Sequence, residues 1–100
     1  MTIVIFMYKI KFFKNNNEEI INQNEIEYLK EELIVKKTTD DSVISLDFKH
    51  QKCEFKIDDI VIEIPVIEMS FNLDENTDTF YYTLVSEPDI KNAIIIHKIK

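Results

Sequence analysis

Apolar and polar residues alternate along most of this 100-residue chain, and the alternation predicts β-strands. Residues 2–13, TIVIFMYKIKFF, are β-branched and aromatic, with lysines at alternate positions near the end. They predict an N-terminal strand with one wet face. Further strands are predicted within 42–49, 53–57, 58–73, 79–86 and 93–99. Pro65 cannot donate to a strand ladder, so it marks a bulge, an edge or a break between two strands.

Residues 66–73 and 78–85 fit a hairpin whose tip is Asp74-Glu75-Asn76-Thr77, with residue 73 facing residue 78. The predicted pairs are Ile67–Leu84, Met69–Tyr82 and Phe71–Phe80 on an apolar face, and Glu68–Thr83, Ser70–Tyr81 and Asn72–Thr79 on a polar face. A slip of one residue would mix the two faces, which makes this register specific. We therefore expect Phe71 in the core, where Phe71→Ala would cost about 3–5 kcal/mol.

One stretch, residues 18–35, has helical character. Ile26, Leu29 and Leu33 have the spacing of one apolar stripe, and Asn24 with Glu27 fits a capping box. These features predict a helix over 25–34, although LIVKKTTDDSVISLDFK is equally compatible with a hairpin that turns at TTDD. The expected fold is α+β, a single domain over 1–100. An antiparallel sheet of about five to seven strands would carry the helix on its apolar face.

Composition excludes several classes of site. An apolar content of 45% is typical of a globular domain, and Cys53, the single cysteine, rules out an intrachain disulfide. The chain has no glycine and no arginine, so it lacks glycine-rich phosphate loops, nucleophile elbows and bidentate guanidinium contacts. The N-terminal apolar run has neither the length of a membrane span nor the order of a signal peptide. We therefore expect a cytoplasmic protein that does not bind membranes.

Two sets of residues have the beginnings of a metal site. Asp74-x-Asn76-x-Asp78 opens like a calcium loop, but Thr79 and Val85 stand where that loop needs glycine and glutamate. His50 and Cys53 have the spacing of two zinc ligands, but a structural zinc site needs four. We therefore expect a turn histidine beside an inward-facing cysteine. His97 is expected as a hydrogen-bonded, partly buried strand histidine. We expect no metal, no cofactor and no catalytic residue.

The acidic residues are unevenly placed. The net charge is −7, and residues 57–90 contain nine acidic side chains and no lysine. An acidic face repels nucleic acid and attracts basic protein surfaces. The candidate partner-binding residues are Asp58, Asp59, Glu63, Glu68, Ser70, Asp74, Glu75, Asp78, Tyr81, Glu87 and Asp89. Reversing Glu63, Glu68 and Asp78 to lysine is expected to leave the fold intact and to slow association about tenfold or more.

These features favour a non-catalytic inhibitory binding protein that neutralises a basic partner, such as a nuclease or another nucleic-acid-processing protein. An immunity protein against a nuclease-type toxin fits this description, and a phage anti-defence inhibitor is the alternative. If the acidic residues serve only to keep the protein soluble, no binding partner is required. The alternative of another class is a small structural subunit or a homodimer formed by strand addition, with 92–99 or 2–8 as the exposed edge.

Overall fold

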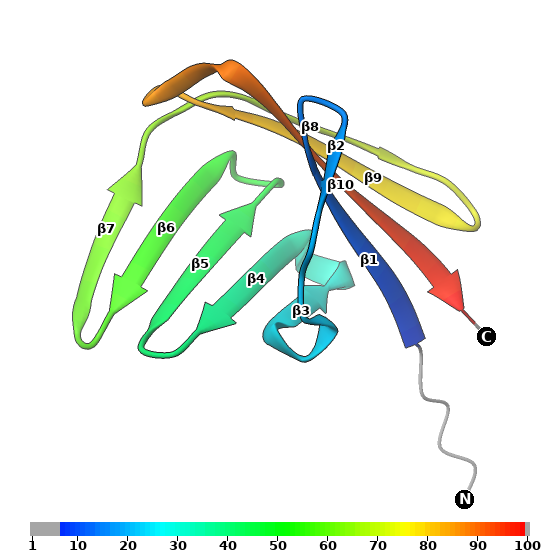
Figure 1. Cartoon of the computed structure of the whole chain (residues 1–100), viewed down its shortest axis with the longest axis horizontal. Helices are drawn as coiled ribbons and strands as arrows, with labels where there is room; N and C mark the ends of the chain where they lie inside the picture. Colours follow the sequence, from blue (N-terminus) through cyan, green and yellow to red (C-terminus); the bar gives the residue numbers. More distant parts are fainter. Residues whose placement is uncertain (1–6, 100) are drawn as a thin grey trace, which may run out of the picture.

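The computed structural model describes residues 7–99, which form two antiparallel sheets of five strands each (Figure 1). Sheet A has the order β2-β1-β10-β9-β8, and sheet B has the order β3-β4-β5-β6-β7. The strands are β1 (Met7–Lys14), β2 (Asn17–Glu19), β3 (Ile26–Leu29), β4 (Ile34–Thr39), β5 (Ser42–Asp47), β6 (Lys52–Ile57), β7 (Ile60–Ile64), β8 (Val66–Leu73), β9 (Thr77–Leu84) and β10 (Glu87–Ile99). Two 3-10 turns, η1 (Gln23–Glu25) and η2 (Lys30–Glu32), flank β3.

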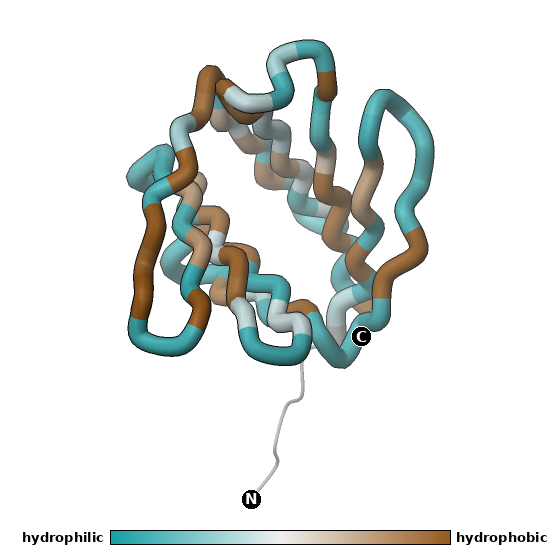
Figure 2. Tube along the Cα trace, turned by 60° about the vertical axis from the view of Figure 1, so that its left-hand side comes forward, coloured by the Kyte–Doolittle hydropathy of each residue, from teal (hydrophilic) through white to brown (hydrophobic). Residues whose placement is uncertain are grey.

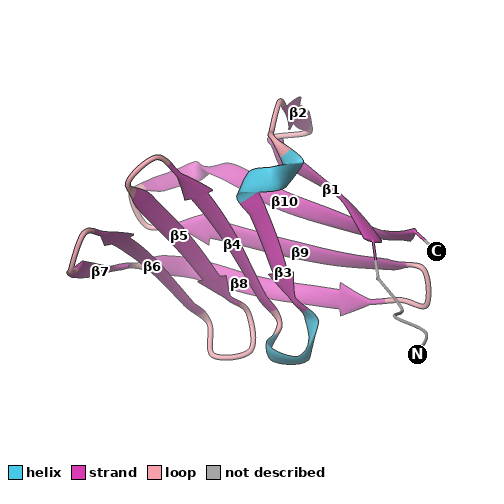
Figure 3. Cartoon of the chain, turned by 90° about the horizontal axis from the view of Figure 1, so that it is seen from below, coloured by secondary structure: helices cyan, strands magenta, loops and turns pink. Residues whose placement is uncertain are grey.

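The two sheets pack face to face with their strands crossing rather than running alongside one another (Figure 3). Hydrophobic stretches occur in both sheets, while the turns that join the strands are hydrophilic (Figure 2). The fully buried centre contains Phe80, Ile94 and Ile96 from sheet A and Val35 and Phe48 from sheet B or its turns. Burial of these apolar side chains between the layers is the main source of stability.

The expected α+β architecture is wrong, because the described chain is almost entirely strand and has no helix packed on a sheet. The predicted helix over 25–34 contains strand β3 between two short 3-10 turns. Within β3, Glu27 points to solvent and pairs across the strands with Lys36, so period two prevails over the helical spacing. Leu33 then adopts a left-handed conformation, with φ of 54°, which ends the turn. Asn22, rather than Asn24, caps η1.

The alternative of a hairpin turning at TTDD is confirmed. Strands β4 and β5 pair from Ile34↔Asp47 to Thr39↔Ser42 around a turn at Asp40 and Asp41. Asp40 has a φ of 35°, and Asn15, Asn16 and Asp58 also take positive φ at hairpin turns. Apart from glycine, asparagine and aspartate tolerate this conformation best, so they take most of these turn positions in a chain that lacks glycine, while Gln51 takes the one in the β5–β6 turn.

The predicted hairpin of β8 and β9 is confirmed, with its tip at residues 74–76. The pairs Met69↔Tyr82, Phe71↔Phe80 and Ser70↔Tyr81 are as expected, and so are Glu68↔Thr83, Asn72↔Thr79 and Leu73↔Asp78. The Ile67–Leu84 pair is wrong, since a bulge at Ile67 places Val66 opposite Leu84. Pro65 lies in the break between β7 and β8, one of the three roles expected for it.

The sheet edges differ from expectation. Strand β10, which includes 92–99, lies between β1 and β9, so it is a central strand and provides no edge. Residues 2–6 of the other expected edge lie outside the described chain, and β1 pairs with β10 on one side. On its other side, the Gln23 side chain exchanges two hydrogen bonds with the backbone of Ile10. The outermost strands of the two sheets are β2 and β8 in sheet A and β3 and β7 in sheet B.

Candidate binding surface

Strand β7 is an edge strand with exposed apolar side chains. It pairs with β6 alone, and Ile60, Val61 and Ile62 are 60%, 56% and 50% exposed. Natural edge strands are usually protected by lysine, proline or a bulge, whereas β7 has only Glu63 as a charged residue. An exposed apolar group of this kind marks an interaction surface more often than an isolated exposed leucine does.

The register of sheet B explains why these side chains are uncovered. The row Val35–Leu46–Cys53 faces sheet A and is fully buried, and it continues to Ile64 on β7. Nearer the β6–β7 turn, Ile62 and Ile60 lie on the same face of sheet B but are exposed, whereas Phe55, the cross-strand neighbour of Ile62, is partly buried. Sheet A, crossing at a steep angle, therefore covers only part of this face (Figure 3).

The free backbone groups of β7 follow from its hairpin with β6. The two-residue turn at Asp58 and Asp59 makes Ile57 and Ile60 a hydrogen-bonded pair, and such pairs alternate along an antiparallel ladder. Alternate residues from Ile60 therefore direct their backbone groups to β6. Val61 and Glu63 direct theirs to the open edge.

Most of the candidate acidic residues surround this strand. Strand β7 lies at the left end of the molecule in Figure 1, with the β6–β7 turn at its lower end and the β9–β10 turn beyond its upper end, and we call this end of the molecule the β7 end. The acidic residues carried by these segments and by the first residues of β8 and β10 are Asp58, Asp59, Glu63, Glu68, Glu87 and Asp89. The β8–β9 turn, with Asp74 and Glu75, lies at the opposite end of sheet A. The structure thus divides the predicted set in two.

Two carboxylates at the β7 end face each other directly. Glu54 on β6 is the cross-strand partner of Glu63 on β7, and both are exposed. Like charges in opposed positions are destabilising, and neither carboxylate has an ion-pair partner among residues 7–99. The next pair along the same face is Lys56 opposite Val61. A cation supplied from outside would relieve the Glu54–Glu63 repulsion.

Asp78, a predicted surface residue, is instead completely buried. Its Oδ2 accepts hydrogen bonds from the Tyr28 hydroxyl at 2.8 Å and from Lys30 Nζ at 3.0 Å, and its Oδ1 lies 3.3 Å from Lys98 Nζ. Burial alone would raise the pKa of Asp78, but the hydrogen bonds from Tyr28 and Lys30 and the lysine charges hold this pKa below its usual range. Asp78 ties the two sheets together, so reversing it would disrupt the core rather than probe a partner.

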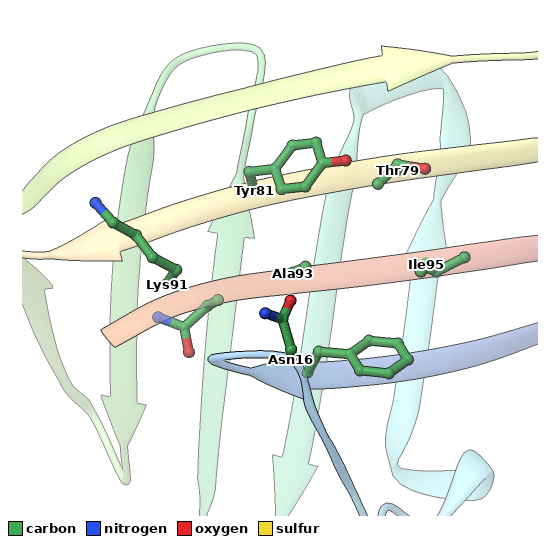
Figure 4. A pocket seen from close by; sticks show the side chains of 8 residues that line it. Asn16, Thr79, Tyr81, Lys91, Ala93 and Ile95 are labelled. Carbon is green, nitrogen blue, oxygen red and sulfur yellow. The ribbon is translucent and has the colours of Figure 1, made fainter. Parts of the chain in front are cut away.

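Ser70 and Tyr81 lie on the outer face of sheet A. Tyr81 is 49% exposed and borders an open depression of about 350 Å³ with Lys91 beside it (Figure 4). The floor of the depression contains Ala93 and Ile95. A second depression on this face brings Ser70, Tyr81 and Lys91 together with Glu68. Because Lys91 offsets Glu68, this face is mixed in charge and not acidic.

The cysteine and the histidines have the structural roles expected from the sequence. Cys53 is buried in the core, and His50 lies exposed in the β5–β6 turn, 2.9 Å from a carboxylate oxygen of Asp47. His97 is half-buried on β10, with its Nδ1 3.4 Å from the Thr77 hydroxyl. No group of three histidine, cysteine or acidic side chains within residues 7–99 could hold a metal ion.

Burial raises the pKa of the Cys53 thiol to about 11. Since the thiolate is the reactive form, we expect native protein to react with iodoacetamide at pH 8 at least about tenfold more slowly than the same protein in urea. Equal rates, followed by mass spectrometry, would contradict the burial of Cys53.

Ile60, Val61 and Ile62 were not among the candidate binding residues expected from the sequence. Consecutive apolar residues in a short run are typical of a strand buried on both faces, so the pattern points away from an edge.

Comparison with protein-family models, curated proteins and solved structures finds no match for the chain. The helices of the described residues are single 3-10 turns, none with the length and hydropathy of a membrane span.

Proposed function

We propose that this protein is a non-catalytic binding protein that neutralises a basic protein partner through its β7 end. The single observation that carries this proposal is the open edge of β7, where Ile60 and Ile62 on one face and Val61 on the other are at least half exposed, with carboxylates on the same strand and its turn. An apolar centre with a polar rim is the usual anatomy of a protein–protein contact.

The charge of the β7 end favours a basic partner over other ligands. Carboxylates repel the phosphates of nucleic acids and membranes, and they accelerate the encounter with lysine-rich or arginine-rich proteins. Proteins with such surfaces commonly bind nucleic acid, and occupation of that surface blocks their substrate. An immunity protein against a nuclease-type toxin, and next to it a phage anti-defence inhibitor, fit this chemistry.

A pull-down with three baits tests the proposal. Wild-type protein, the variant Asp59→Lys/Glu63→Lys and the control Glu32→Lys/Glu75→Lys are incubated at low salt with lysate of the cells that carry this gene. Both variants change the net charge by the same amount, and neither Glu32 nor Glu75 makes a side-chain hydrogen bond or ion pair in the described structure. We expect wild type and control to retain the same basic protein and the β7 variant to retain at least about tenfold less.

High salt should release that protein, because screening weakens exposed charge pairs. Equal retention by the β7 variant and the control would contradict the proposed surface. Retention that resists salt and survives the charge reversal would instead favour a structural assembly.

A further inference from the structure

We propose that β7 takes an extended basic segment of the partner as a sixth, antiparallel strand of sheet B, with lysine or arginine opposite Glu63. This inference rests on the proposed function, because it specifies how the β7 end would engage its partner. Addition of a strand to an open sheet edge is a recurring mode of peptide recognition, in which main-chain hydrogen bonds supply affinity and side-chain pockets supply specificity.

The backbone of β7 is suited to this mode. Val61 and Glu63 direct their N–H and C=O groups to the open edge, as the Asp58–Asp59 turn requires. The turn at Asp40 and Asp41 leads to the same orientation. It fixes which opposed residues of β4 and β5 are hydrogen-bonded pairs, and these in turn fix the hydrogen-bonded pairs of β5 with β6. An added strand would therefore form hydrogen-bonded pairs at Val61 and Glu63 without disturbing a bond to β6.

Side chains on the two faces of β7 specify the pattern of the added strand. On the face toward sheet A, Ile60, Ile62 and Ile64 call for apolar residues opposite them. On the other face, a cation opposite Glu63 would also lie near Glu54. A neutral residue is expected opposite Val61, because the cross-strand partner of Val61 on β6 is Lys56, which would repel a second cation. Read from its N-terminus, the predicted segment is apolar, basic, apolar, neutral, apolar.

A second copy of this chain fits the edge less well. Edge-facing residues must oppose edge-facing residues, which leaves three central registers for β7 against itself. A register centred on Glu63 places the Glu63 residues of the two copies opposite each other. A register centred on Val61 places Glu63 of one copy opposite Asp59 of the other. Centring on Ile62 avoids both contacts, but leaves the Glu54–Glu63 pair without a cation in each copy. Each copy also carries a net charge of −7, so charge favours a basic segment.

A synthetic peptide tests the strand directly. The probe is acetyl-Thr-Val-Lys-Val-Thr-Val-Thr-amide, and the control has glutamate in place of lysine. In an NMR titration of the full chain, we expect the probe to slow the amide exchange of Val61 and Glu63 more than that of Ile60 and Ile62, whose N–H groups already bond to β6. The glutamate peptide should bind at least about tenfold more weakly, because it places a third carboxylate beside Glu54 and Glu63.

Two changes each remove one hydrogen-bond donor at the edge. Val61→Pro lacks the outward N–H, whereas Val61→Thr keeps it, and both lose the valine side chain. We expect the probe to bind Val61→Pro at least about tenfold more weakly than Val61→Thr. Methylation of the backbone nitrogen of the peptide lysine should have a similar effect on wild-type protein, and this version does not depend on the folding of a variant. Equal binding in both comparisons would overturn strand addition.

The results separate this inference from the proposed function. If Val61→Pro captures the partner as well as wild type does, while Asp59→Lys/Glu63→Lys does not, the surface stands and strand addition is wrong. If neither variant affects capture, both proposals fail. A wild-type dimer in sedimentation equilibrium that Val61→Pro dissociates would assign the edge to a second copy and overturn the basic segment.

Discussion

Replacing Phe80 by alanine is expected to lower the free energy of unfolding by about 3–5 kcal/mol, as is usual for a fully buried phenylalanine. The Phe80 side chain is 0% exposed, and its ring centroid lies 4.6 Å from that of Phe48 and 5.7 Å from that of Tyr28. These contacts join the two sheets at the centre of the core. Removal of the ring would leave a cavity that neither sheet can close without moving the other.

Phe71→Ala is the matched control for this prediction. Phe71 is the cross-strand neighbour of Phe80 on the same face, but it lies on edge strand β8 and is 43% exposed. The expectation from sequence that Phe71 is a core residue is therefore wrong. We expect Phe71→Ala to cost less than half as much as Phe80→Ala in urea or guanidinium unfolding. Equal costs would show that sheet B covers β8 more fully than the structure indicates.

Removing both lysines that contact Asp78 should have a comparable effect. The Asp78 side chain is 0% exposed, while Lys30 and Lys98 are 40% and 25% exposed. The variant Lys30→Met/Lys98→Met leaves the carboxylate buried without a cation, and such losses typically cost 3–5 kcal/mol. Because the lysines are partly solvated, we expect about 3 kcal/mol at pH 7. Each single variant should cost less than half of this, since the other cation remains.

The pH dependence distinguishes loss of the ion pairs from loss of packing. In the wild type the pKa of Asp78 is held below its usual range, so its contribution to stability is present above about pH 4 and is lost as pH falls further. In the double variant only the Tyr28 hydrogen bond would oppose the effect of burial, so the pKa of Asp78 would be higher than in the wild type. The stability difference should therefore be largest near pH 7 and shrink toward pH 3. A constant difference across this range would contradict the electrostatic account.

Some of the fold could be predicted because it depends on local pattern. The β8–β9 register followed from period-two alternation over two strands joined by a short polar tip. The helix over 25–34 was wrong because Ile26, Leu29 and Leu33 satisfy a helical stripe, while the pairing of Glu27 with Lys36 on another strand is not visible in local sequence. Tertiary pairing overrode a local preference.

The candidate site shows the same division. The predicted register already placed Asp78 on the same face as Phe80 and Tyr82, so its burial could have been expected from the sequence. Its partners could not, because Lys30 and Lys98 are brought to it from sheet B and from β10. The edge position of β7 was also beyond local reasoning, because strand order is set by long-range pairing.

A hydrogen-exchange footprint of the complex tests most directly whether the β7 end is the binding surface. The protein retained in the pull-down is added to this chain, and deuterium uptake is compared with that of the free chain. Strongest protection is expected in peptides that cover residues 54–68, with little change in those that cover 73–77. Protection centred on the β8–β9 turn, or on the outer face around Tyr81, would contradict the β7 end as the site of binding.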